Sequence, residues 1–563
     1  MNGIFMLVLS IVVLVGAYLV YGRYLAKKWG VDAKRKTPAM EMEDGVDYVP
    51  TSRQVVFGHQ FASIAGAGPI NGPIQAAIFG WVPVLLWVLI GGVFIGAVQD
   101  FGSIFASVRN KGRSIGYIIE LYVGKLGKRL FLLFVWLFSI LVIAAFADIV
   151  AGTFNGFNAD ASTNLINGAT ATTSTAFIAV AVALGFFIRY KKPYNLVTTV
   201  VAIAALVACI VFGLAFPVYI QKTLWLYLVF AYIMVASVVP VWALLQPRDF
   251  LNSFLLVFMI AAAVVGIFVA NPTINLPAFT GFVVNGQQMF PILFVTIACG
   301  AVSGFHSLVS SGTASKQIRN EKDMLPIAYG AMLLESLVAV ISLICAGAVF
   351  ANGALPAGTP PQIFAMAVAG FLAKAGIPTL ASNTIITLAI SAFALTSLDS
   401  VARIGRLAFQ ELFMDSGTDE EHMSLPLRIL TNKYVATIAT LFFGYLLSVN
   451  GYAKIWPLFG SANQLVSALA LCAIAIFLKK TSKKGSMIWI PMFFMLGVTF
   501  TALIQIIIAR IGKLGSGNFQ MLSDGMQLVF AILLVGLGLV IAFKSIHTLF
   551  LERNKEEKKA EAA

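Results

Sequence analysis

Two histidines lie inside apolar segments long enough to cross a membrane, where an ionisable side chain is costly. His59 is followed four residues later by Ser63, and His306 is followed at the same spacing by Ser310. Imidazole changes its charge near physiological pH, so these side chains could carry a coupling proton. We expect each histidine either to bind a proton or substrate or to be a hydrogen-bonded structural residue.

Glycine and proline interrupt the segment around the first histidine, in the run GHQFASIAGAGPINGP. Proline lacks an N–H and glycine tolerates conformations that end helices, so a regular helix should break here. We predict that Gly66 and Gly68 end one half-helix, that Asn71 caps the next and that Pro73 lies in its first turn. The freed backbone groups would bind a substrate anion or a cation.

The second histidine precedes small and hydroxyl-bearing residues without a proline. We predict a similar break there, with binding groups supplied by Ser310, Ser311, Gly312, Thr313 and Ser315. A polar pair, Asn463 and Gln464, lies in the apolar segment after Trp456 and Pro457. These amides either bind substrate or join helices by hydrogen bonds. The many phenylalanines are assigned to packing and lipid contact.

Carboxylates inside apolar segments are the candidate ion-coupling groups, because ionisable side chains in lipid are rare and usually functional. Asp148, Glu335 and Asp399 fall in such segments. Asp399 also lies four residues before Arg403, so an ion pair within one helix is an equally weighted alternative.

Asp100 lies nearer the end of its segment, and we expect it to pair with Arg109 or Arg113. If the coupling ion is sodium rather than a proton, Thr396 and Ser397 would add oxygen ligands. The sequence has no metal-ligand spacing and no phosphate-binding or dinucleotide fingerprint, so we expect no metal, no cofactor and no enzyme activity.

The composition requires membrane helices to position these groups. Hydrophobic residues make up 59% of the chain and charged residues 11%, and the mean hydropathy is +0.91. We predict an all-α polytopic membrane protein with about fifteen transmembrane helices, each of roughly 20 apolar residues. They fall near residues 4–22, 54–80, 83–108, 130–151, 175–190, 195–218, 224–245, 250–270, 289–318, 325–350, 384–411, 433–449, 455–478, 486–511 and 525–547. A weaker run at 362–376 is predicted to be re-entrant or interfacial.

The placement of basic residues predicts the orientation, because cytoplasmic loops retain Lys and Arg. With the amino terminus outside and the carboxy terminus in the cytoplasm, all but five of the 38 Lys and Arg fall on the cytoplasmic side. The exceptions are Lys222, Lys374, Lys454, Arg510 and Lys513. The net charge of +14 is thus explained by topology and anionic lipid, without a nucleic-acid partner.

Weak internal repeats relate the two histidine segments. A similar offset places the residues around Asp148 onto those around Asp399, and the predicted topology inverts one copy relative to the other. Inverted repeats with discontinuous helices hold substrate and ion near the bilayer midplane in transporters of the LeuT and APC type. We predict an amino-terminal anchor and basic loop, two repeats and carboxy-terminal helices with a charged tail, over residues 1–53, 54–288, 289–480 and 481–563.

Four stretches resemble the carbon-starvation (CstA) family of bacterial inner-membrane transporters: GHQFASIAGAGPINGPIQAA, GAVQDFGSIFASVRNKGRSIG, SLDSVARIGR and WPLFGSANQL. The resemblance implies uptake of peptides, or of a small carboxylate such as pyruvate, during carbon starvation. We expect a secondary active transporter that works by alternating access, with proton symport favoured over sodium symport. The oligomeric state is not predicted.

Two other classes of function remain open. The two histidines could be haem ligands in a membrane redox protein, although glycine-broken helices are poor haem walls. The chain could also be a nutrient sensor that binds a solute without moving it, although it has no recognisable signalling domain.

Overall fold

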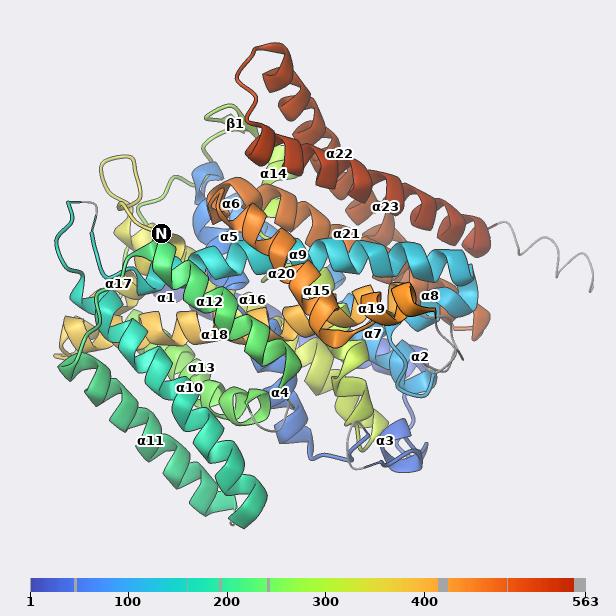
Figure 1. Cartoon of the computed structure of the whole chain (residues 1–563), viewed down its shortest axis with the longest axis horizontal. Coiled ribbons are helices and arrows are strands. Elements are labelled where there is room, and N and C mark those ends of the chain that lie inside the picture. Colours follow the sequence, from blue (N-terminus) through green and yellow to red (C-terminus); the bar gives the residue numbers. More distant parts are fainter. Residues whose placement is uncertain are drawn as a thin grey trace, which may run out of the picture.

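The computed structural model describes residues 2–44, 48–158, 160–191, 195–239, 244–413, 424–483 and 485–550. The chain is helical as predicted, and the only sheet in these ranges is a hairpin of β1 (Val283–Val284) and β2 (Gln287–Gln288) (Figure 1). The first half contains α1 (Gly3–Ala17), α2 (Arg23–Trp29), α3 (Pro38–Glu41), α4 (Arg53–Ile64), α5 (Gly68–Ala76), α6 (Trp81–Gly91), α7 (Ala97–Arg109), α8 (Ile115–Val123), α9 (Lys125–Phe154), α10 (Leu165–Lys191), α11 (Asn195–Ala215), α12 (Lys222–Val238) and α13 (Leu245–Ala270).

The second half contains α14 (Met289–Thr296), α15 (Gly304–Gly312), α16 (Ala331–Val349), α17 (Pro360–Ala373), α18 (Thr379–Leu412), α19 (Leu425–Leu430), α20 (Lys433–Ser448), α21 (Tyr452–Lys480), α22 (Ser486–Gly515) and α23 (Met526–Phe550). Turns of π-helix extend several of them, namely η1 (Tyr18–Gly22), η3 (Gly92–Gly96), η6 (Leu325–Gly330) and η8 (Met521–Gly525). Short 3-10 turns are η2 (Ala77–Phe79), η4 (Ala314–Lys316) and η5 (Glu321–Asp323).

Eleven helices of the described residues are long and apolar enough to cross a membrane. Three shorter apolar helices, α12, α17 and α20, fall below that length. Helix α17 occupies the run predicted to be re-entrant or interfacial, and its 14 residues are fewer than a full crossing needs. The count of fifteen crossings and the re-entrant segment stay predictions, because helix length and composition by themselves identify only eleven spans in the described residues.

The break after α4 confirms the first predicted interruption and corrects its detail. Helix α4 ends at Ile64 and α5 begins at Gly68, with Pro69 in its first turn. Asn71 and Pro73 were predicted at the start of the second half-helix, but both lie inside it. The Asn71 amide instead donates to the Ala67 carbonyl at 2.9 Å, because Gly68 and Pro69 already begin the helix.

The second break lies within residues 289–318, where a broken helix was predicted, but earlier than the hydroxyl-rich stretch that was expected to form it. It occupies residues 297–303 between α14 and α15, whereas Ser310, Ser311 and Gly312 are helical. The backbone opens at Gly300, whose φ of +89° favours glycine. A Cβ there would also lie 2.7 Å from Cβ of Ala339. The serine hydroxyls do not break the helix because they bond within it or to neighbouring elements.

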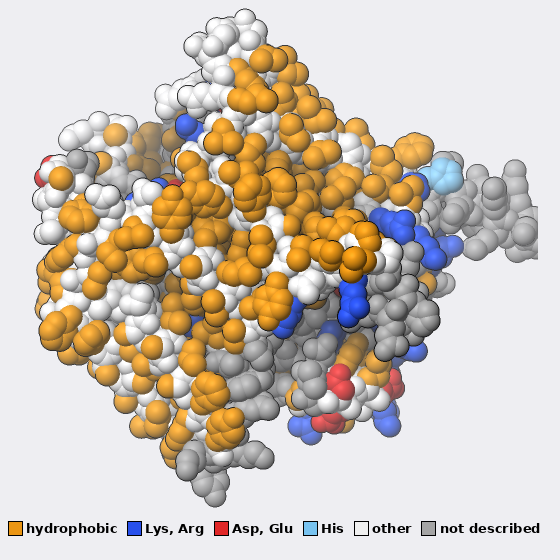
Figure 2. Space-filling model, in the orientation of Figure 1, with side chains coloured by type: hydrophobic (Ala, Val, Ile, Leu, Met, Phe, Trp, Pro, Cys, Tyr) orange, Lys and Arg blue, Asp and Glu red, His pale blue; other side chains and the backbone are white. Residues whose placement is uncertain are grey.

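The two broken helices lie side by side in opposite directions, since α4 contacts α15 and α5 contacts α14. Helices α18 and α21 contact the broken helices, and α9 packs against both α18 and α21. Figure 1 shows α10 with α11 on one flank and α22 with α23 on the other. On the face shown in Figure 2, most Lys and Arg side chains gather toward the end that carries α2, α3 and α8. Such an asymmetry is expected if basic side chains concentrate on the cytoplasmic side. The orientation and the repeat boundaries stay predictions.

Candidate transport site

The two breaks face each other across a small central cavity of about 20 Å³. Its polar or small lining residues are Gly66 and Gly68 of the first break, Cys299 of the second, Ser397 of α18 and Asn463 of α21. Its apolar wall consists of Ile64, Phe138, Val142, Phe146, Phe305, Val401 and Phe459. A space of this size holds about one water molecule. A molecule larger than water therefore requires this cavity to widen.

Glycines allow the elements around the cavity to approach closely. A Cβ on Gly66 would lie 2.6 Å from Oγ of Ser397, and a Cβ on Gly68 would lie 2.5 Å from Sγ of Cys299. Real side chains do not tolerate such contacts, so larger residues would push α18 and the second break away. Both glycines were predicted at the site, and the structure brings them together with Ser397.

Asn463 and Gln464 satisfy the backbone of the second broken helix. The Asn463 carbonyl oxygen accepts the N–H of Phe305 at 3.0 Å, which caps α15, and its amide donates to Oγ of Ser303 at 3.0 Å. The Gln464 amide donates to the Phe294 carbonyl of α14 at 2.5 Å. The structure thus supports the helix-joining alternative for both residues, while Asn463 also lines the cavity.

The amino terminus of α5 differs from that of α15. No side chain of the described residues caps α5, and Gly66 and Gly68 place this end at the cavity wall. Pro69 has no N–H, and the N–H groups of Ile70 and Asn71 donate to the Ala67 carbonyl. The helix dipole and the N–H of Gly68 still favour a negative charge at this end. The first break therefore offers the cavity an anion-attracting surface.

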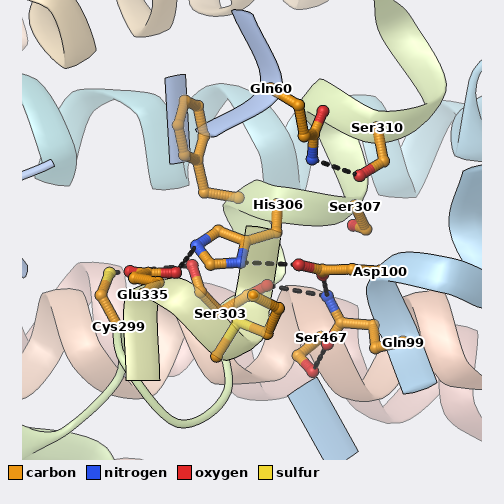
Figure 3. A network of polar contacts seen from close by, with 12 residues as sticks. Gln60, Gln99, Asp100, Cys299, Ser303, His306, Ser307, Ser310, Glu335 and Ser467 are labelled. Atoms are coloured by element: carbon orange, nitrogen blue, oxygen red, sulfur yellow. Dashed lines mark hydrogen bonds and ion pairs between the residues drawn. The ribbon is translucent and has the colours of Figure 1, made fainter. Parts of the chain in front are cut away.

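A fully buried cluster of Asp100, His306 and Glu335 lies beside the second break (Figure 3). Nδ1 of His306 is 2.9 Å from Oδ2 of Asp100, and Nε2 is 3.1 Å from Oε2 of Glu335. The three residues come from α7, α15 and α16. The expected pairing of Asp100 with Arg109 or Arg113 is wrong, because Arg109 instead pairs with Glu321 at 2.8 Å.

Hydrogen bonds connect this buried cluster to the cavity. The Gln99 amide donates to the Ser303 carbonyl at 2.7 Å and lies 3.4 Å from Oδ1 of Asp100. Ser303 in turn bonds Asn463, which lines the cavity. Gln99 also accepts a short hydrogen bond from Ser467 of α21 (Figure 3). The network therefore spans from Glu335 to the cavity wall through the second break.

His59 occupies a different place from His306. It lies in α4, where its Nε2 is 3.3 Å from Oγ1 of Thr313, and the neighbouring Gln60 donates to Oγ of Ser310 at 2.8 Å. Oγ of Ser311 accepts the N–H of Ile115 at 3.2 Å. These predicted binding residues join α4, α8 and α15, and none of them lines the cavity.

The two histidines do not face a common space. Ser63 of α4 is buried and Gly312 ends α15, and neither borders the cavity. Both ring nitrogens of His306 lie against carboxylates, so they are not available to a haem iron. The arrangement gives no support to the redox alternative.

Asp399 belongs to a second buried cluster, behind α18 as seen from the cavity. It contacts the guanidinium of Arg248 and accepts the Tyr232 hydroxyl at 2.8 Å. Oγ1 of Thr396 accepts from the Asn252 amide at 2.5 Å. The alternative of an Asp399–Arg403 pair is wrong, because Arg403 donates to the last carbonyls of α12. Ser397 faces the cavity instead.

Asp148 has a structural environment at the ends of three helices. Its Oδ1 is 2.7 Å from Nζ of Lys222, and its Oδ2 accepts the N–H of Tyr452 at 2.9 Å. The carboxylate therefore caps α21 and neutralises a lysine of α12. Neither Glu335 nor His306 is among its hydrogen-bond or ion-pair partners in the described residues.

Several site residues were not singled out from the sequence. Arg248 precedes the predicted span at 250–270, although it lies in α13. Cys299 and four phenylalanines that were assigned to packing line the cavity. The run Ala298-Cys299-Gly300 was a signal for the true break, because glycine flanked by small residues permits a turn.

Comparison with known proteins agrees with this architecture. The family described as carbon starvation protein CstA matches residues 2–355 and 348–502. The chain is 34% identical to "Peptide transporter CstA" of Escherichia coli over 93% of its length and 84% of that protein. It is 33% identical to "Pyruvate/proton symporter BtsT" of the same organism over 87% of its length and 79% of that protein.

A manganese transporter of Eremococcus coleocola, solved with an aromatic bis-isothiourea compound, has a similar fold at 13% identity and a TM-score of 0.50. The similarity covers 90% of this chain and 99% of that one, and it concerns the fold alone. With the matched segments, the relatives and the broken helices taken together, this chain belongs to the carbon starvation protein CstA family.

Proposed function

We propose that this chain is a secondary transporter that imports a peptide or a small carboxylate such as pyruvate across the bacterial inner membrane, with proton symport. Its relatives bear the names of a peptide transporter and of a pyruvate/proton symporter. The observation that carries the coupling proposal is the buried Asp100–His306–Glu335 cluster.

Charge counting explains why this cluster suits a proton. With His306 protonated and both carboxylates ionised, it has one net negative charge, and no other charged side chain of the described residues contacts it. A net charge in a dry interior is unfavourable. Binding of one more proton makes the cluster neutral, so proton occupancy and local structure should be linked.

The second break couples this proton to substrate. Asn463 and Ser303 border the break, and the α5 amino terminus faces the same cavity. We infer that a substrate carboxylate binds at the α5 end when the cavity opens. Movement of the second break would then change both the cavity and the position of His306.

Sodium is the less favoured coupling ion. The oxygens proposed for it lie around Asp399 and Thr396, where the guanidinium of Arg248 already provides a cation. A sodium ion beside Asp399 would meet that positive charge.

The proposed topology has fifteen crossings, with the amino terminus outside. Helices α12 and α20 and the two broken helices, added to the eleven long helices of the described residues, account for this number. The short α17 then lies at the outer surface. Two inverted repeats of this kind would allow alternating access by movement of one repeat against the other.

The test uses purified protein in liposomes with an imposed inward proton gradient. Uptake of labelled pyruvate and of a labelled dipeptide is measured in parallel, without and with sodium. We expect one of them to accumulate without sodium and to be lost with a protonophore. Accumulation that requires sodium would refute proton coupling, and binding without flux from correctly inserted protein would indicate a sensor.

A further inference from the structure

An apolar groove lies between α1, α4 and the continuous helix η6–α16, apart from the transport cavity. Its volume is about 310 Å³, and it opens onto the molecular surface. Helix α1 belongs to a span that is only 28% buried, so this groove is at the periphery of the helical bundle. Its lining residues are Ile11, Leu14, Val15, Tyr18, Phe57, Gly330, Leu333, Leu334 and Leu337.

The spacing of the lining residues makes the groove elongated along the helices. Ile11, Leu14 and Tyr18 lie on one face of α1 and η1, and Gly330 and Leu337 lie seven residues apart on the opposing wall. Seven helical residues correspond to roughly 10 Å. Such a groove matches an extended hydrocarbon chain that runs parallel to the helices.

Positive charge lies at one end of the groove. Arg23 lies five residues after the groove residue Tyr18 on the continuous helix η1–α2, and Arg53 lies one turn before the groove residue Phe57 in α4. Both arginine side chains are exposed. Within the described part of the chain, neither arginine forms an ion pair and the Tyr18 hydroxyl forms no hydrogen bond. Two free guanidinium groups and a free hydroxyl therefore adjoin an apolar groove, an arrangement complementary to a phosphate with a tail.

We propose that this groove binds an anionic phospholipid, with an acyl chain between α1 and α16 and the phosphate at Arg23 and Arg53. Basic pockets between membrane helices bind anionic head groups, and each basic residue favours them over neutral lipid. The lipid would contact Phe57 of α4. Helix α4 also carries His59 and Gln60, which bond Thr313 and Ser310 at the carboxyl end of α15. A bound lipid would therefore influence the position of the inner halves of both broken helices.

The test is binding, measured by native mass spectrometry of the purified full-length protein after titration with phosphatidylglycerol or phosphatidylcholine. We expect wild type to retain one phosphatidylglycerol in preference to phosphatidylcholine. Arg23→Gln/Arg53→Gln should weaken phosphatidylglycerol binding by about tenfold or more and leave phosphatidylcholine binding unchanged. Gly330→Leu, which fills the groove without changing a charge, should weaken both.

The matched control is Arg428→Gln/Lys433→Gln, which removes the same net charge from α19 and α20. It should bind phosphatidylglycerol as wild type does. Equal binding of the two lipids by wild type, equal weakening by the control, or complete displacement by inorganic phosphate would overturn the proposal. Since the readout is lipid binding, its failure is distinct from a failure of the transport proposal.

Discussion

At the scale of single residues, Glu335 is the most informative member of the buried cluster. Both of its oxygens are buried, and Oε2 lies 3.1 Å from Nε2 of His306. Glu335→Gln keeps the shape of the side chain and removes its ionisable oxygen. We expect the accumulation ratio in a proton gradient to fall to about one, because an uncoupled carrier only equilibrates its substrate. Exchange between equal substrate pools should persist.

The matched control for this change is Asp148→Asn. It also neutralises a buried carboxylate, but that carboxylate caps α21 and pairs with Lys222. We expect a loss of thermal stability of about 1 kcal/mol and retained accumulation. The coupling role of Glu335 is refuted if Glu335→Gln accumulates substrate as wild type does.

Asp399 and Arg248 are predicted to act as a structural pair. Asp399→Asn removes the closer of the two carboxylates beside the buried guanidinium and leaves only Asp249, at 3.8 Å. Breaking a buried pair destabilises a protein by about 3–5 kcal/mol. Replacing both residues, with Arg248→Met and Asp399→Leu, should recover much of that loss. Thermal unfolding in detergent measures both effects. A double variant as unstable as the single one would argue that the charges have a further role.

At the scale of secondary-structure elements, the close approach of the two breaks should depend on Gly68. A Cβ there would fall against Cys299, so Gly68→Ala should separate α5 from the second break and strongly reduce transport. Cys299→Gly in the same chain should restore part of the activity, because it removes the opposing side chain. Gly370→Ala is the control, since nothing lies within 4 Å of its added Cβ. Liposome uptake measures all three, and full activity of Gly68→Ala would contradict the packing argument.

The position of the first break was predictable from local sequence, whereas for the second only its presence within residues 289–318 was. Gly68 and Pro69 force a helix to restart, and this requirement is independent of the surroundings. Gly300 permits a break without forcing one. A glycine is required at this position because a Cβ would collide with Ala339, which is distant in sequence. For the same reason the partners of Asp100, Asp399 and Asn463 appear only once the helices pack. Hydrophobic length predicted the helices, but not which polar residues face each other.

At the scale of the whole molecule, orientation can be tested with single cysteines. The four native cysteines are buried, so they should give little background with a membrane-impermeant maleimide. Ser162 in the loop after α9 and Lys34 in the loop after α2 are both exposed, and the proposed topology places them on opposite sides. We expect Ser162→Cys to be labelled in intact cells, whereas Lys34→Cys requires permeabilised cells. The reverse pattern would invert the topology, and it would place α4 and α15 in the outer rather than the inner half of the membrane. Labelling of both in intact cells would mean that the two loops lie on the same side of the membrane. The fifteen-crossing arrangement, which puts three crossings between them, would then be wrong.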